Sequence, residues 1–533
     1  MPDFDGADLI AGLKANGCTI GDDLFALCPI EGMGNGAVAT RDIPSGTALF
    51  SIPSSYLLSE HTSTLSTHLK PEDWASLEGG WTRLILALMW EDSRAESPWR
   101  AYLDAMPGSF STPMWWPAPD LALLKGTDIE NRIGRASADR DYDERVAPLL
   151  AAYPGVFVGD FSKECYHRQG SRVLSRSFTV PRARVDAGYR KEKEEKEARS
   201  EDSDEEEEEE EEEQVAVMVP LADMLNAAYE MDNARLFSPD EEEDEEEDEE
   251  GEEKGEGEGE EQGDVSMRSA ASAAPAASAS ANKASDDAYT MTTTRDINAG
   301  EQIPAPLAAN AQYNTYSSPC NSELLRKYGH VDLLPFPSSF ASQLPSSVFP
   351  QLGGNAGDEV ELSGDLVLRA IAAQLRKPIE FDADGRPNPP WDERLEAWLE
   401  DADDTFILTL DPADGLPEEL LSFVRLFLED SEWERTKQKG KMPKPTPTEE
   451  ALGVIDAAIT ARLARYAAEG LEGDAEIVEK GERGRNAHNA AVVRLGEKRC
   501  LVLGRNRVAE MKRELKKRRI AERKEQREAK RRR

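Results

Sequence analysis

Cysteine and histidine are scarce in this 533-residue chain, which has five of each. The cysteines form no CxxC pair and have no pair of histidines nearby; they are Cys18, Cys28, Cys165, Cys320 and Cys500. The composition therefore supports neither a disulfide framework nor a structural zinc site, and it is typical of a reducing compartment. We expect a functional site without a metal.

Long apolar runs are missing as well. The longest, Leu84 to Trp90, is far shorter than the ~20 residues that span a bilayer. Acidic residues occupy the N-terminus, where a signal peptide would be basic and then apolar. These absences predict a soluble intracellular protein with no membrane partner.

The commonest catalytic signatures are also absent. The sequence contains no P-loop, GxSxG elbow or HExxH motif, which argues against the usual NTPases, hydrolases and zincins. The segment EGMGNG, with Gly32, Gly34 and Gly36, is no dinucleotide fingerprint, because Ala37 takes the sixth position and a strand follows. Two interpretations remain: a glycine-rich β-turn, or a turn whose bare backbone lies against a small ligand.

Acidic residues outnumber basic ones by 105 to 63, giving a net charge of −42. Residues 201–213 contain twelve acids, and residues 240–261 contain seventeen. The last segment, 505–533, is basic, with fifteen bases and five acids. The remaining body is still acidic, so we expect no direct nucleic-acid binding by the folded part.

The hydrophobic pattern alternates between β-rich and helical blocks. Short apolar stretches separated by turns predict three or four strands over 23–58, and a 3.6-residue period over 71–168 predicts helices. One helical face should carry Trp81, Leu84, Ile85, Leu88 and Met89. A second β-rich block is expected to begin near Val173 and to resume after each acidic run. Such polar, low-complexity runs predict disordered insertions at 190–214 and 238–288.

One short sequence occurs twice. Thr40–Gly46 reads TRDIPSG and Thr294–Gly300 reads TRDINAG, each between two apolar strands. The match predicts two similar strand–turn–strand units within one β fold. Beyond residue 332 the spacing is helical again, as in the apolar face that follows Pro417, and a charged helical tail is expected at the end.

Two further segments gather side chains suited to a site. Asp223 and Asn226 in VPLADMLN are three residues apart, so they serve either one site or a self-satisfied polar pair. Tyr313, Tyr316 and Tyr328 lie near a predicted strand end and helix. Aromatic residues at such spacing usually belong to a core, but phenolic groups around a channel would suit a cationic amine.

Taken together and in order, these segments resemble a known family. EGMGNGAVATRDIPSG, LSRSF, VPLADMLN with DNARL, and GEQ, YNTY and NSELLRKYGHVD are similar to the SET-domain lysine methyltransferases of the Rubisco large-subunit methyltransferase class. The resemblance implies an α+β fold: a β-rich SET domain split by a helical insertion, then an all-α C-terminal substrate-binding domain. The implied boundaries are 17–60 and 171–332 for the SET domain, 61–170 for the insertion, 333–504 for the substrate-binding domain and 505–533 for the tail.

The resemblance also implies roles for individual residues. Tyr316 matches the catalytic tyrosine, and Arg176 would pair with the carboxylate of S-adenosylmethionine. The other residues implied to bind this cofactor are Glu31, Gly32, Met33, Gly34, Asp223, Asn226, Ala227 and Tyr316 itself. The lysine channel would be walled by Tyr313, Tyr328 and His330.

Three departures from the family pattern accompany the resemblance. Ala227 stands where the family usually has histidine, which favours the ribosomal subgroup. His330 replaces the usual phenylalanine or tyrosine, so the number of methyl groups added stays open. Residues 303–312 are inserted before the tyrosine strand and would give that strand a bulge.

The implied function is a protein-lysine N-methyltransferase acting on a basic protein of the large (60S) ribosomal subunit. We expect the protein to be a monomer. We also expect it in the nucleus, because the tail carries basic clusters typical of nuclear import, with the cytoplasm as a further location. The alternative is an inactive SET scaffold whose acidic loops bind basic proteins.

Overall fold

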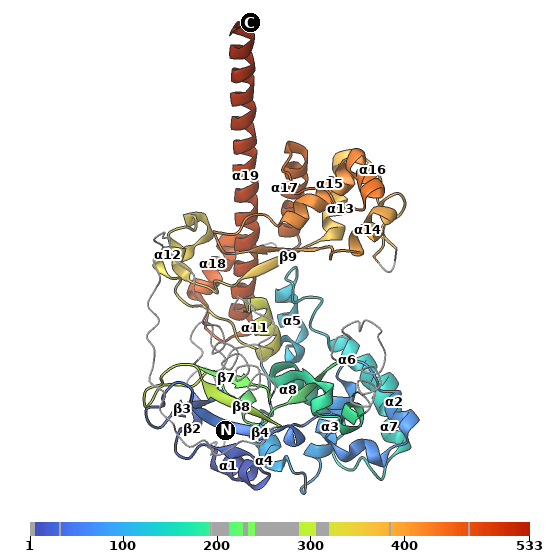
Figure 1. The fold of residues 1–533 in the computed structure, drawn as a ribbon, viewed down its shortest axis with the longest axis vertical. Helices are drawn as coiled ribbons and strands as arrows, with labels where there is room; N and C mark the ends of the chain where they lie inside the picture. The colour runs from blue at the N-terminus through green and yellow to red at the C-terminus, as the bar shows by residue number, and fades with distance from the viewer. Residues whose placement is uncertain are drawn as a thin grey trace, which may run out of the picture. The chain divides into compact units, whose positions relative to one another are not determined.

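The computed structural model describes residues 6–30, 34–191, 193, 213–226, 233–239, 287–304, 319–382, 385–466 and 470–532. The chain forms two compact units: the first contains residues 1–109 and 136–315, and the second contains residues 110–135 and 316–533. Figure 1 traces the elements of both. Each unit has its own hydrophobic core.

A four-stranded antiparallel sheet is the centre of the first unit. Its strand order is β1 (Thr19–Ile20), β4 (Ala48–Pro53), β8 (Ala288–Thr293) and β7 (Ala234–Phe237). Two separate antiparallel pairs complete the β structure: β2 (Phe25–Ile30) with β3 (Gly34–Ala39), and β5 (Ser177–Pro181) with β6 (Gln214–Met218). The strands predicted over 23–58 are thus confirmed as β2, β3 and β4.

Helices pack against these strands at the expected periodicity. Helix α3 (Thr82–Asp92) buries Leu84, Ile85, Leu88 and Met89, whereas Trp81 precedes the helix and is 41 % exposed. Helix α8 (Lys163–Arg176) packs beside α3. The expected strand start near Val173 is therefore wrong, because this helix continues to Arg176 and β5 begins one residue later. Ser162 accepts a hydrogen bond from the Cys165 amide (3.2 Å) and caps the helix start.

The repeated sequence forms a symmetric pair of turns. Ile43 and Ile297 exchange backbone N–H to O hydrogen bonds of 2.8 Å in both directions. Asp42 accepts from the Ala299 amide, and Asp296 accepts from the Ser45 amide, both at 2.9 Å. The two copies therefore lie against each other, as two similar strand–turn–strand units in one β fold.

The second unit is mainly helical, as expected. Its core lies among α13 (Gly364–Leu375), α15 (Glu418–Leu428) and α17 (Glu449–Leu463), which pack on one another, and the long α19 (Asn486–Arg532) packs on α17. Its other helices include α11 (Asn321–Tyr328), α14 (Trp391–Leu399), α16 (Asp430–Lys439) and α18 (Leu471–Lys480). One antiparallel pair, β9 (Glu359–Ser363) and β10 (Thr405–Thr409), is added to the helices.

Residues 110–135 pack within this second unit. Arg462 of α17 pairs with Asp128 (2.7 Å), and Arg494 of α19 donates to the Leu123 carbonyl (2.6 Å). Among the described residues, no helix is long and apolar enough to cross a membrane, and no group of His, Cys, Asp or Glu is placed to hold a metal ion.

Candidate functional site

A strained turn after β6 carries Asp223 into the first unit. Leu221 is fully buried and has a φ of +77°, in the left-handed region that residues other than glycine rarely adopt. A short 3₁₀ turn, η7 (Ala222–Met224), follows it. Backbone strain of this kind persists only where surrounding packing fixes it, and it is frequent at functional sites.

The Asp223 side chain is completely buried between Arg176 and Tyr102. Arg176 donates from Nη1 to the Asp223 carbonyl (2.7 Å) and lies 3.4 Å from its Oδ2. The Tyr102 hydroxyl donates to the same Oδ2 at 2.8 Å. Arg176 is thus oriented by Asp223, at the point where α8 ends and β5 begins.

Burial governs the protonation of this group. It raises the pKa of Asp223, while the Arg176 charge and the Tyr102 hydrogen bond oppose that rise. Burial also raises the pKa of Tyr102 well above its usual range, helped by the neighbouring carboxyl. Tyr102 therefore remains a hydrogen-bond donor at any physiological pH.

Asn226 lies directly against Gly36 of β3. A Cβ added at Gly36 would be 2.6 Å from Asn226 Nδ2 and 3.4 Å from Gln302 Nε2. Among the described residues, three buried side-chain atoms here have no hydrogen-bond partner: the two amide nitrogens and Asp223 Oδ1. Buried polar groups are nearly always paired, so these atoms mark a place where a ligand or water is needed.

Two further hydrogen bonds support the same strand edge. Asn233 donates from Nδ2 to the Gln302 carbonyl (3.0 Å), and Ile303 donates its amide to the Ala37 carbonyl (2.8 Å). Sequence reasoning left Gly36 open as part of a turn that could lie against a small ligand. It missed Tyr102, Asn233 and Gln302 as site residues, although DNARL and GEQ were among the resembling segments. Tyr102 lies in none of the motifs, and its hydrogen-bond partner Asp223 is 121 residues away, so no local pattern indicates their contact.

The second unit contains two of the predicted channel residues. Tyr328 ends α11, and His330 follows Gly329, which has φ of +79°. The two rings lie 6.1 Å apart, centroid to centroid. A Cβ at Gly329 would be 2.3 Å from Ser111 Oγ, so the turn rests closely on residues 111–112.

Several predicted residues fall outside the part of the chain that the structure describes. They are Glu31, Gly32, Met33, Ala227, Tyr313 and Tyr316. Most of the inserted segment 303–312 and both acidic runs, apart from Glu213, are also outside it. Gly34 is described and pairs with Ile30 at the start of β3, with φ of +77°. The predictions for the other residues stay predictions.

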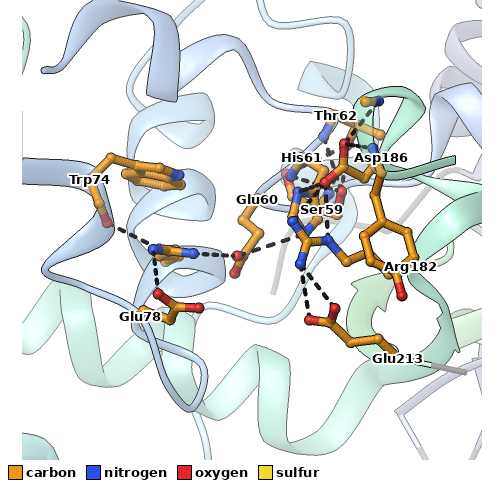
Figure 2. Close-up of polar contacts among 12 residues, drawn as sticks. Ser59, Glu60, His61, Thr62, Trp74, Glu78, Arg182, Asp186 and Glu213 are labelled. Carbon is orange, nitrogen blue, oxygen red and sulfur yellow. Dashed lines mark hydrogen bonds and ion pairs between the residues drawn. The ribbon is translucent and has the colours of Figure 1, made fainter. Parts of the chain in front are cut away.

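A second polar cluster in the first unit was not predicted. Figure 2 shows His61 between two acids, with Nδ1 3.3 Å from Asp186 Oδ2 and Nε2 3.7 Å from Glu60 Oε1. Arg182 donates to Asp186 (3.0 Å) and to both carboxylate oxygens of Glu213 (3.0 Å each). Burial lowers the pKa of His61 in spite of the two acids. The cluster fixes Glu213, the last residue of the first acidic run, to the body.

Comparison with known proteins places this fold. The family model described as "Rubisco LSMT substrate-binding" matches residues 388–501. A solved structure of Rubisco LSMT bound to AdoMet aligns with a TM-score of 0.57 at 15 % identity, covering 95 % of this chain and 92 % of that one. The chain therefore has the fold of Rubisco LSMT, and its residues 388–501 match the substrate-binding family of that protein.

Two curated lysine methyltransferases are similar to this chain in sequence. Human N-lysine methyltransferase SETD6 is 34 % identical over 155 residues, which are 28 % of this chain and 33 % of that protein. Ribosomal lysine N-methyltransferase 4 of Saccharomyces cerevisiae is 27 % identical over 316 residues, 57 % of this chain and 50 % of the yeast protein. The chain thus spans a third to a half of the length of these relatives.

Proposed function

We propose that this protein is an S-adenosyl-L-methionine-dependent protein-lysine N-methyltransferase. The proposal is carried by the unpaired, buried Asn226 amide against bare Gly36, together with the unpaired Oδ1 of Asp223, among the described residues. An unmet buried donor or acceptor costs ~1–3 kcal/mol. A ligand with amino, carboxylate and adenine groups supplies partners of both kinds, so the residues present fit this cofactor. The names of the curated relatives support the same activity.

Different residues of the chain would bind the cofactor and position the lysine. When bound, the cofactor supplies a methyl group on a sulfonium for in-line transfer to an amine. Arg176, held by Asp223, would bind the cofactor carboxylate, and Asn226 would bind its nucleoside side. Lysine has an ordinary pKa of ~10.4, so the protein must favour the neutral amine by burial. Tyr316 would orient that amine by a hydrogen bond, and Tyr328 would wall its channel.

Calorimetry tests the cofactor site. Arg176→Ala and Asn226→Ala should each weaken S-adenosylmethionine binding by ~1–3 kcal/mol, because each leaves a desolvated polar contact unpaired. Tyr316→Phe should bind the cofactor normally and lose most turnover. If both alanine variants bind like the wild type, the cofactor site lies elsewhere. If the wild type binds no cofactor at all, the protein is the alternative scaffold.

The finer proposal concerns the substrate, a basic protein of the large (60S) ribosomal subunit. It is supported by the acidic charge of the chain and by the name of the yeast relative. Ribosomal subunits from cells lacking this protein should accept labelled methyl groups from the wild type but not from Tyr316→Phe. Mass spectrometry of the labelled band then gives the target lysine and the number of methyl groups. Labelling only outside the 60S fraction would refute the ribosomal assignment.

We also propose a nuclear location directed by the basic tail. Val508 is buried and Leu515 packs on the second core, so a truncation should begin at Lys516 to leave the fold intact. A fluorescent fusion lacking residues 516–533 should lose nuclear accumulation. An unchanged distribution would assign the tail another role.

A further inference from the structure

The last part of α19 extends beyond the body of the second unit. Val508 is 1 % exposed, and Met511 and Leu515 are the last apolar side chains packed against the core. Arg519 pairs with Glu449 at 3.7 Å, and no described residue beyond it makes an ion pair with another element. Figure 1 shows the helix continuing past α17. From Lys516 onward, every side chain that the structure describes is exposed.

The sequence explains why this exposed segment stays helical. Residues 516–532 contain no glycine or proline, and alanine, arginine, lysine, glutamate and glutamine supply all positions but Ile520. These are strong helix formers. Because the segment continues a packed helix, it does not bear the cost of nucleating a new one.

Charges on this segment are sorted by face. Residues 516–532 contain ten bases and three acids. At ~100° per residue, eight of the bases fall within an arc of about 160°, and all three acids fall on the opposite side. The basic face consists of Lys516, Lys517, Arg519, Arg523, Lys524, Arg527, Lys530 and Arg531; the acids are Glu522, Glu525 and Glu528. The separation gives one side of a helix about 25 Å long a single sign of charge.

The composition of this basic face selects among partners. A helix that binds a membrane surface needs an apolar face opposite the basic one, and here that side carries acids. A protein interface needs apolar or aromatic anchors at its centre, and Ile520 is the one large apolar residue of the segment. A row of arginine and lysine suits a row of phosphates, with arginine able to bind each phosphate in bidentate fashion.

We propose that the basic face of residues 516–531 binds the phosphate backbone of double-helical nucleic acid, without reading bases. The binding site lies on the tail helix and is separate from the acidic folded body. It would hold the protein near a polyanion whatever the sequence of that partner. RNA and DNA share this phosphodiester chemistry, and the test separates them.

The test compares full-length variants by fluorescence anisotropy with labelled 20-base-pair RNA and DNA duplexes between 50 and 200 mM KCl. The basic-face variant carries Arg523→Gln, Arg527→Gln, Lys530→Gln and Arg531→Gln. The exchange variant carries Glu522→Arg, Arg523→Glu, Arg527→Glu and Glu528→Arg, which keeps the net charge and destroys the face. Circular dichroism checks that both keep their helix content.

The wild type should bind at least one duplex with an affinity that falls steeply with salt. The basic-face variant should bind at least tenfold more weakly at 50 mM KCl, with a log–log salt slope smaller by about 3 to 4, since each phosphate contact contributes ~0.9. The exchange variant should lose as much. The proposal is overturned if the wild type binds neither duplex, or if either variant binds like the wild type. Binding to only one duplex identifies the nucleic acid concerned.

Discussion

A single glycine matters most at the residue scale, and not for its flexibility. Gly36 pairs with Cys28 in the β2–β3 ladder, and its φ is not positive. Its importance is the missing Cβ, which lets Asn226 and Gln302 bring their amide nitrogens against the strand. Gly34 thus has the positive φ that glycine-rich turns use, and Gly36 presents bare backbone to Asn226. Contact of this segment with a ligand stays a prediction.

Gly36→Ala should weaken S-adenosylmethionine binding at least tenfold while lowering the melting temperature only slightly. The new Cβ would lie 2.6 Å from Asn226 Nδ2 and 2.9 Å from Ile30 Cγ1, so the Asn226 side chain must move. Gly155→Ala is the matched control, because its Cβ meets no atom within 4 Å and its φ is not positive. Calorimetry and thermal unfolding of both variants measure the effect. Normal cofactor affinity in Gly36→Ala would show that Asn226 does not bind the cofactor.

A buried acid in the second unit makes a pH prediction. Burial, with Asp128 nearby, raises the pKa of Glu497 from 4.5 to about 8, opposed by Arg462 and by the Tyr466 hydroxyl. The folded state therefore holds a proton that the unfolded state releases above pH 4.5. Stability from this group is complete below pH 4.5 and is lost as pH rises towards 8.

Glu497→Gln should remove this pH dependence, since glutamine keeps the acceptor for Ser322 (2.8 Å) and the Asp128 amide (3.0 Å). The difference in unfolding free energy between variant and wild type should change steadily in favour of the variant from pH 5 to pH 8. Urea unfolding across that range measures it. A constant difference would mean that Glu497 does not titrate there.

At the scale of elements, the two copies of the repeated turn bind each other. Asp42 and Asp296 each cap the other copy's turn, around the Ile43–Ile297 bridge. The sequence predicted two similar units, but a seven-residue match cannot reveal that the copies pair with each other over 254 positions. That pairing depends on the order of strands in the sheet, which local patterns do not encode.

Asp42→Ala and Asp296→Ala should destabilise the protein by similar amounts, ~0.5–1.5 kcal/mol each, because each removes one exposed side chain to backbone hydrogen bond. The corresponding asparagine variants should retain most of the stability, since asparagine keeps the acceptor. Chemical unfolding of the four variants checks this. A large effect at one site and none at the other would show that the two turns are not equivalent.

At the scale of the whole chain, the order and type of the secondary-structure elements could be predicted from the sequence. The assignment of segments to the two compact units could not. Periodicity located α3 and the strands of 23–58, and the resemblance located Asp223, Asn226 and Arg176. Residues 110–135 look like part of the helical insertion in sequence. Their grouping with the second unit depends on buried ion pairs such as that between Asp128 and Arg462, whose members are 334 positions apart, beyond the reach of any local signal.

The acidic runs provide the last prediction. Arg182 donates hydrogen bonds to Glu213 and to Asp186, and so holds Glu213 on the described body (Figure 2). A deletion must therefore spare Glu213. Removing 194–212 and 240–285 should leave the fold and the turnover of a short peptide largely intact, since the cost of closing a loop grows only with the logarithm of its length.

The same deletion tests whether the runs attract a basic substrate. Exposed charges act over a Debye length of ~8–10 Å at physiological salt, so a steering effect must weaken as salt rises. On an intact basic protein, kcat/KM should fall on deletion at low salt and converge with the wild type at high salt. If kcat/KM keeps the same salt dependence without the runs, they do not steer the substrate; if the deleted protein fails to fold, they are not dispensable insertions.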